Sequence, residues 1–186
     1  MSRDSDLIED IKIVFSGHNL SGCYTADTES ELYIVETDKR SYMQKTDVPV
    51  CFKIHNPKCK LIHFIAVDAC FITDSYTGKY NDCIVFDDTD FCFIELKLNV
   101  ISTYKRTMRK RIPGAVEQLG AMIDYFNTGF QGASKDFMSL GFNYEAYIVL
   151  PTRSYPQNTA SKTNRKVKFA KKYKIKLFED NQKTFL

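Results

Sequence analysis

The stretch that decides the fold runs from Tyr80 to Asn99 and has the sequence YNDCIVFDDTDFCFIELKLN. Two of its segments, 82–86 and 91–98, are rich in β-branched and aromatic residues, which favour β-strands. The tetrapeptide DDTD at 87–90 separates them and has the composition of a turn. This pattern predicts a β-hairpin that is apolar over most of both strands.

The register of the predicted hairpin brings two acids together. A turn at 87–90 places Phe86 opposite Phe91, and counting back two residues at a time places Asp82 opposite Glu95. Lys97 falls on the same face as Glu95. Directly opposed residues have Cβ atoms about 4.5–5.5 Å apart, and like charges there are destabilising. The geometry therefore requires a proton or a cation between the two carboxylates.

The chemistry of this cluster favours a divalent metal. A charged group at the end of a buried hairpin is costly unless it is paired or metal-bound. Carboxylates such as Asp82 and Glu95 suit Mg²⁺ or Mn²⁺, and the backbone carbonyl of Leu96 supplies a third ligand. Lys97 would then lie beside a metal-bound water. A surface hairpin with a Glu–Lys pair and an unrelated Asp is the alternative.

Asp82, followed thirteen residues later by Glu95-Leu96-Lys97, resembles the PD-(D/E)xK motif of restriction-endonuclease-like nucleases. The resemblance implies that Asp82 and Glu95 hold the metal and that Lys97 assists the attacking water and the charged transition state. Asn81 stands where the motif has proline, a position that is loosely kept in this superfamily. On the helix that follows the motif, Gln118 matches a glutamine that often points at the active site. An ordinary polar residue at the helix rim is the alternative for Gln118.

Two further acids are candidates for the same site. Glu9 lies on a predicted helix at 6–15, where the resemblance implies an extra metal-proximal acid. Its spacing from Asp6 instead fits a capping box. Asp68 interrupts an apolar run, so it is either an additional metal acid or the mark of a bulge or strand end.

Length and composition indicate one folded domain over residues 1–186, in which the resemblance implies a nuclease-like core at about 48–180. The chain is 44% hydrophobic and has no apolar run of membrane-spanning length. The N-terminal sequence MSRDSDLIED has no signal-peptide h-region, so we expect a cytoplasmic protein without membrane association.

The six cysteines lie mostly in apolar, strand-like segments and include no CxxC pair. We therefore expect them to be reduced and buried, as in a reducing compartment, and not to form disulfides. His55, Cys59 and His63 would align as zinc ligands on a helix, but the Asn56-Pro57 pair favours a turn there.

Charge is distributed unevenly along the chain. Residues 1–100 contain 10 Lys and Arg against 17 Asp and Glu, whereas residues 101–186 contain 16 against 6. This asymmetry predicts an acidic, metal-holding half and a basic half that contacts phosphates, with solvated surface lysines as the alternative. The candidate backbone contacts are Lys105, Arg106, Arg109, Lys110, Arg111, Lys166, Lys168, Lys171 and Lys172.

The order of predicted elements indicates an α/β fold in which helices flank a mixed central β-sheet, and the resemblance implies that this is a restriction-endonuclease-like core. The predicted strands are 32–35, 48–54, 61–72, the hairpin, 144–150 and 174–178. Helices are predicted from Pro113 to Phe126 and over 165–173. Loops are predicted at 16–31, 36–47 and 127–143.

The function expected from these features is that of a Mg²⁺- or Mn²⁺-dependent endonuclease, acting on DNA in preference to RNA. No base-reading motif is visible, so we expect weak intrinsic sequence specificity or a guiding or activating protein partner. The sequence is also compatible with a homodimer. Family association suggests defence against phage or mobile DNA. The alternative is a non-catalytic subunit with a nuclease-like fold that binds nucleic acid or a partner protein.

Overall fold

The computed structural model describes residues 3–38, 40–72, 80–98, 105–151 and 160–186, apart from the side chains of 105–110. It contains helices, strands and one 3₁₀ turn in this order: α1 (Arg3–Val14), β1 (Tyr24–Asp27), β2 (Glu31–Thr37), β3 (Arg40–Gln44), β4 (Phe52–His55), β5 (Ile62–Ala66), β6 (Cys83–Phe86), β7 (Asp90–Leu96), α2 (Lys105–Gly132), η1 (Phe137–Ser139), β8 (Asn143–Val149), α3 (Ala160–Tyr173), β9 (Lys176–Glu179) and β10 (Gln182–Thr184).

The strands form two sheets. The larger sheet has the order β1-β5-β6-β7-β8-β9, and the smaller has the order β10-β4-β2-β3. In the larger sheet β1, β5, β6 and β7 pair antiparallel, whereas β7, β8 and β9 pair parallel. Parallel neighbours need a crossover, which α2 supplies between β7 and β8 and α3 supplies between β8 and β9. The predicted class, α/β with mixed sheet and flanking helices, is therefore confirmed at this level.

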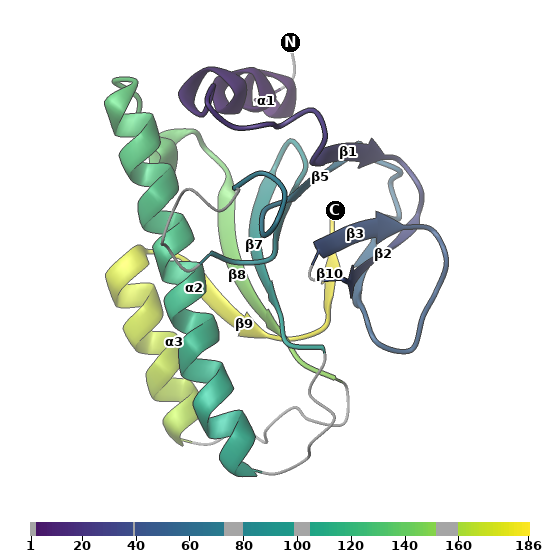
Figure 1. Ribbon diagram of the computed structural model, residues 1–186, viewed down its shortest axis with the longest axis vertical. Helices are drawn as coiled ribbons and strands as arrows, with labels where there is room; N and C mark the ends of the chain where they lie inside the picture. The colour runs from purple at the N-terminus through teal and green to yellow at the C-terminus, as the bar shows by residue number, and fades with distance from the viewer. Residues whose placement is uncertain (1–2, 39, 73–79, 99–104, 152–159) are drawn as a thin grey trace.

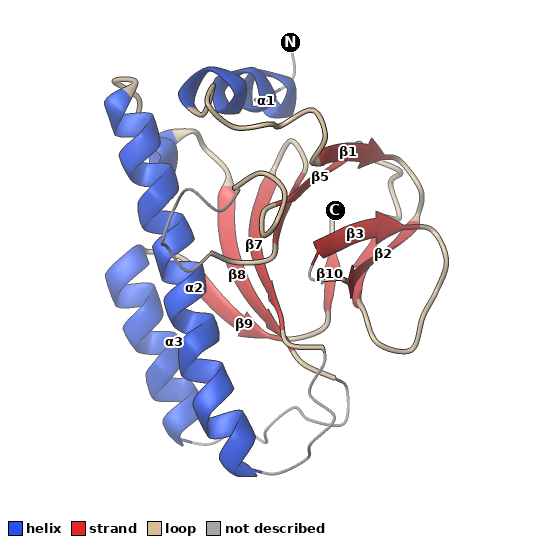
Figure 2. Cartoon of the chain, viewed as in Figure 1, coloured by secondary structure: helices blue, strands red, loops and turns tan. Residues whose placement is uncertain are grey.

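Helices and the smaller sheet cover opposite faces of the larger sheet (Figures 1 and 2). On the helix side, the ring of Phe126 in α2 packs edge-on against Phe93 in β7, with ring centroids 5.8 Å apart. On the other side, Phe52 of β4 packs against Tyr147 of β8 at 5.1 Å. Buried aromatic side chains therefore fill both interfaces, and they fix the larger sheet as the central layer.

The predicted hairpin register is confirmed. Phe86 pairs with Phe91 and Ile84 with Phe93, as the count from the turn requires. In the turn, Oδ1 of Asp87 accepts hydrogen bonds from the backbone N–H groups of Thr89, at 2.8 Å, and of Asp90, at 2.6 Å. A short side chain that binds the backbone two residues on is what makes aspartate a turn former.

Helix α2 is longer than predicted at both ends. It begins at Lys105 and contains Pro113 in its interior, so the prediction that Pro113 opens the helix is wrong. The basic residues before Pro113 carry no apolar periodicity that would have extended the prediction. The helix also continues past Phe126, because Phe130 one turn later is fully buried and extends the core-facing stripe.

Two predicted loops contain strands. Segment 16–31 includes β1, and segment 36–47 includes β3. Both strands lie at the edges of their sheets, and most of their residues are exposed or half-buried. Their sequences therefore lack the apolar alternation on which the strand predictions depended.

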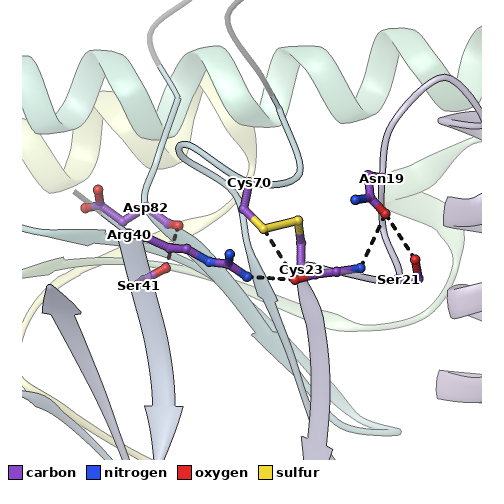
Figure 3. Close-up of a disulfide and its surroundings, with 8 residues drawn as sticks. Asn19, Ser21, Cys23, Arg40, Ser41, Cys70 and Asp82 are labelled. Atoms are coloured by element: carbon purple, nitrogen blue, oxygen red, sulfur yellow. Dashed lines mark hydrogen bonds between the residues drawn. A yellow bond between two sulfur atoms is a disulfide. The ribbon is translucent and has the colours of Figure 1, made fainter. Parts of the chain in front are cut away.

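The prediction of reduced cysteines is wrong for Cys23 and Cys70, which form a disulfide (Figure 3). The backbone N–H of Ala66 donates to the carbonyl of Cys23 at 2.8 Å, so the start of β1 lies beside the turn that follows β5. The two Cα atoms are 5.6 Å apart although the residues are 47 positions apart in sequence. Because two cysteines form this bridge, the cysteine content no longer indicates that the protein lies in a reducing compartment. Among the described helices, none is long and apolar enough to cross a membrane.

Candidate functional site

The candidate site lies where β6 begins and β7 ends, beneath α2. Asp82 directly precedes β6, and three neighbours hold its backbone. Its carbonyl accepts a hydrogen bond from the N–H of Val67 at 2.9 Å. It also accepts one from the hydroxyl of Ser41 at 2.9 Å (Figure 3). Its own N–H donates to the carbonyl of Ile94 at 3.1 Å. Both sheets therefore position Asp82.

Asn81 explains why this chain needs no proline before Asp82. Its side chain is buried, and Nδ2 donates to the carbonyls of Cys83 and, at 3.1 Å, of Ile94. These bonds fasten the start of β6 to β7, a role that proline, without a side-chain donor, would leave unfilled.

The two predicted carboxylates lie at this end of the hairpin, close enough for the charge of Asp82 to act on Glu95. Asp82 accepts a hydrogen bond through Oδ2 from the N–H of Leu96. Because the N–H and C=O of a strand residue point to the same side, the Leu96 carbonyl also faces the Asp82 side. Glu95 is fully buried; its Oε1 accepts from Lys97, while its Oε2 has no hydrogen-bond partner among the described residues.

Lys97 and Gln118 complete the cluster. The ammonium of Lys97 donates to Glu95 and, at 3.1 Å, to Oε1 of Gln118. Gln118 in turn donates through Nε2 to the carbonyl of Tyr80 at 2.8 Å. The structure therefore brings together all four predicted residues, Asp82, Glu95, Lys97 and Gln118.

Burial dominates the electrostatics of Asp82. It raises the pKa of this carboxyl from 3.8 to about 7, although the Leu96 amide and the Lys97 ammonium favour the charged form. The negative charges of Glu36 and Asp68 raise the pKa further. The carboxyl of Asp82 therefore titrates near neutral pH.

The pKa of the Glu95 carboxyl is raised by the same surroundings. Burial raises its pKa well above the usual range, and the charge of Asp82 raises it further, while Lys97 opposes both effects. The Asp82–Glu95 pair is thus stable at neutral pH only if it shares a proton or a cation.

The donor set fits a hard divalent cation. The Oε2 of Glu95, the carboxylate of Asp82 and the Leu96 carbonyl offer oxygen ligands of the kind that Mg²⁺ and Mn²⁺ prefer. The described residues contain no cluster of three or more His, Cys, Asp or Glu side chains arranged around one point. A cation here would therefore also need water or substrate oxygens, as Mg²⁺ sites commonly do.

One neighbouring acid was missed by the sequence analysis. Glu36 lies in β2, in a segment predicted to be a polar loop. It is half-buried; burial raises its pKa, Lys97 lowers it, and Asp68 raises it. Glu36 belongs to the smaller sheet, so only the packing of the two sheets could have revealed it.

The two further acids of the sequence analysis have different positions. Asp68 is exposed in the turn after β5, and its N–H lies 3.4 Å from the Asp82 carbonyl. It marks the end of that strand and contributes charge to the site. Glu9 instead lies on the exposed side of α1, paired with Lys12 at 2.6 Å. The capping-box interpretation of Glu9 is also wrong, because α1 begins at Arg3 and Asp6 lies inside it.

The zinc alternative finds no support in the positions of the histidines. His55 and His63 lie in different sheets, on β4 and β5, and not on one helix. His63 binds Tyr24 and Asp4, each at 2.8 Å, and His55 pairs with Glu31.

The basic candidates divide between two helices. Arg111 is exposed on α2, whereas the side chains of Lys105, Arg106, Arg109 and Lys110 lie outside the described residues. Helix α3 carries no acid at all, and its basic residues are Lys162, Arg165, Lys166, Lys168, Lys171 and Lys172.

Comparison of the chain with protein-family models, with curated proteins and with solved structures gives no match. A function is therefore inferred from the arrangement of side chains around Asp82 and Glu95. The residues of a site determine function, whereas one fold can support many functions.

Proposed function

We propose that this protein is a Mg²⁺- or Mn²⁺-dependent nuclease that hydrolyses phosphodiester bonds, with DNA preferred to RNA. One observation carries the proposal: Asp82, Glu95 and Lys97 converge, and the buried Oε2 of Glu95 has no hydrogen-bond partner in the part of the chain that the structure describes. A buried, unpaired carboxylate oxygen is costly, and a bound cation would offset that cost.

Each residue has a distinct role in this proposal. Asp82 and Glu95, with the Leu96 carbonyl, would hold the cation, which supplies Lewis-acid activation of water and of the phosphate. Lys97 places a positive charge beside Glu95, where it can orient a water and stabilise negative charge. Gln118 accepts from Lys97 and so fixes the direction of its ammonium.

The element order supports assignment to the restriction-endonuclease-like class. A helix, α1, precedes the antiparallel strands β5, β6 and β7; α2 then crosses to the parallel strand β8. This order corresponds to the core expected from the PD-(D/E)xK resemblance, and the candidate site lies at the end of the motif strand. The acid-free helix α3 supports a polyanionic substrate.

The biological setting belongs to the same proposal. The described residues include no helix-turn-helix or zinc finger for base reading, so we expect a guiding or activating protein partner. A role in defence against phage or mobile DNA follows from the resemblance alone, whereas the expected cytoplasmic location rests on the N-terminal sequence.

A cleavage assay tests the nuclease proposal. Purified protein is incubated with plasmid and with single-stranded DNA in Mg²⁺, Mn²⁺ or EDTA, beside Asp82→Asn and Glu95→Gln. Asp88→Asn is the matched control, because Asp88 is an exposed carboxylate at the turn of the same hairpin. Cleavage that requires metal and is lost in the first two variants but not in the control is the expected result.

Calorimetric titration with Mn²⁺ supplies a readout that is independent of turnover. Wild type and Asp88→Asn should bind the ion, and Asp82→Asn should bind it at least about tenfold more weakly. Cleavage that persists in Asp82→Asn and Glu95→Gln would remove the assigned mechanism.

The second candidate function is a non-catalytic subunit that binds nucleic acid. The lack of a three-acid cluster among the described residues favours it. Salt-sensitive binding of DNA without cleavage in any metal would select this function, and repeating the assay with candidate partner proteins would then separate a subunit from an enzyme that awaits activation.

A further inference from the structure

A groove of about 760 Å³ separates α2 from α3, which lie side by side in Figure 1. Apolar side chains line it on both sides: Pro113 and Val116 from α2, and Phe169 and Tyr173 from α3. Three cations of α3, Arg165, Lys168 and Lys172, line it as well. The groove thus combines apolar walls with positive charge.

The cations lie on one stripe of α3. Arg165, Lys168 and Lys172 are spaced i, i+3 and i+7, which places them on a common helix face. Arg165 is engaged by Glu179, to which its Nε donates at 3.1 Å. Lys168 and Lys172 are exposed, so they are the cations that can meet an incoming anion.

The aromatic wall is held firmly in position. The ring of Tyr173 packs against Phe169 with centroids 4.7 Å apart, and the ammonium of Lys172 lies 4.6 Å from its centre. Against α2 the ring meets Gly120, where a Cβ would lie 2.7 Å from Cζ of Tyr173. Tyr173 therefore presents a fixed, half-buried ring beside the cations.

We propose that this groove binds single-stranded nucleic acid, with a base against Tyr173 and adjacent phosphates on Lys168 and Lys172. A single strand presents both a π-face and a charged backbone, and known single-strand sites combine aromatic platforms with basic grooves. A duplex stacks its bases internally, so it would use the cations but leave the apolar walls without a partner.

The groove adjoins the candidate nuclease site, and the assignment of the strand as substrate rests on the proposed function. Gln118 faces Lys97, while the preceding residue, Glu117, lines the groove. The same turn of α2 therefore has the site on one side and the groove on the other.

Fluorescence anisotropy with a labelled oligothymidine of about 15 nucleotides tests the assignment. The wild-type chain is kept in EDTA, so that binding is measured apart from cleavage. We expect Lys168→Ala/Lys172→Ala to weaken binding about tenfold at low salt and to lower the slope of log K against log salt by about 1.4.

The matched control is Lys166→Ala/Lys171→Ala. It removes the same charge from the same helix, but neither residue lines the groove. We expect this control to lose about twofold or less in binding affinity, because only the net charge of the protein changes. Glu117→Gln should bind more tightly because a negative charge leaves the groove.

Three results would overturn the groove assignment: equal losses in the two double variants, tighter binding of a hairpin duplex than of the single strand, or no binding by the wild type at low salt. Its failure is distinct from failure of the nuclease proposal. Unchanged binding by the groove variants, together with metal-dependent cleavage, would contradict the groove assignment alone. Groove-specific binding without cleavage, also in the presence of candidate partner proteins, would contradict the nuclease proposal and leave the groove assignment intact.

Discussion

The Nζ atom of Lys97 donates a hydrogen bond of 3.1 Å to the Oε1 atom of Gln118, which joins the end of β7 to α2. Gln118 is also bound to the Tyr80 carbonyl, so its amide cannot rotate without losing one of the two bonds. The direction of the Lys97 ammonium therefore depends on a residue that has no charge of its own.

Replacing Gln118 by Leu should lower kcat about tenfold and leave KM nearly unchanged, because the change misdirects Lys97 without removing a substrate contact. Steady-state cleavage kinetics measure both constants. Asp124→Asn, an exposed change on the same helix, serves as the control. Equal kinetics for Gln118→Leu and wild type would show that Lys97 needs no such support.

The raised pKa of Asp82 makes stability depend on pH when no metal is present. Its pKa is about 7 in the folded protein, against 3.8 ordinarily, so the folded state binds more protons than the unfolded state between these values. The free energy of unfolding should therefore fall as pH rises through this window, by up to about 4 kcal/mol.

Thermal unfolding in EDTA at pH 5 and pH 8 measures this effect. The wild type should lose more stability at the higher pH than Asp82→Asn, whose side chain does not ionise. Saturating Mg²⁺ should restore the wild type at pH 8 by binding the folded state. Identical pH dependence in the two proteins would contradict the assigned titration.

Gly120 lies where the Tyr173 side chain of α3 packs against α2. A Cβ at this position would meet the ring of Tyr173, whose Cζ would lie 2.7 Å away. Gly120→Ala should therefore destabilise the protein by about 1–3 kcal/mol, despite the better helix propensity of alanine.

Gly114 is the matched control for Gly120, since it lies in the same helix with nothing within 4 Å of its Cβ position. Gly114→Ala should stabilise by about 0.5–1 kcal/mol. Chemical denaturation measures the free energy of unfolding of both variants. The double variant Gly120→Ala/Tyr173→Phe is measured beside them, because it relieves part of the clash. A stable Gly120→Ala protein would mean that the helices lie further apart.

The hairpin was predictable because its signals are local. The turn at 87–90 and the period-two count from Phe86 and Phe91 give the register, which the structure shows from Cys83 opposite Ile94 to Phe86 opposite Phe91. Continuing the same count by one residue predicts Asp82 opposite Glu95. Gln118 could be predicted as a site residue only through the family resemblance, because no pattern in the sequence places α2 over the end of β7.

The missed features are those that depend on long-range packing. Glu36 reaches the site through the smaller sheet, and Cys23 meets Cys70 because β1 pairs with β5. A cysteine spacing does not determine a pairing when six cysteines are present. The edge strands β1 and β3 were missed because exposed strands have little apolar pattern.

The disulfide lies close to the support of the candidate site. Cys70 belongs to the turn after β5, and in the same turn the N–H of Val67 donates to the Asp82 carbonyl at 2.9 Å. On the other side of the bridge, Arg40 donates to the carbonyl of Gly22 at 2.7 Å, next to Cys23 (Figure 3). Loss of the bridge should therefore loosen the turn that positions Asp82.

Cys23→Ser should lower the free energy of unfolding by about 2–4 kcal/mol, because the bridge restricts the unfolded chain across 47 positions of sequence. The same variant should bind Mn²⁺ more weakly, since the turn behind Asp82 is no longer anchored. Denaturant unfolding and calorimetry with and without dithiothreitol measure the two effects. Cys51→Ser/Cys59→Ser should behave like wild type, because both of these cysteines are free thiols. If dithiothreitol changes neither the stability nor the Mn²⁺ affinity of the wild type, the bridge contributes nothing to the site.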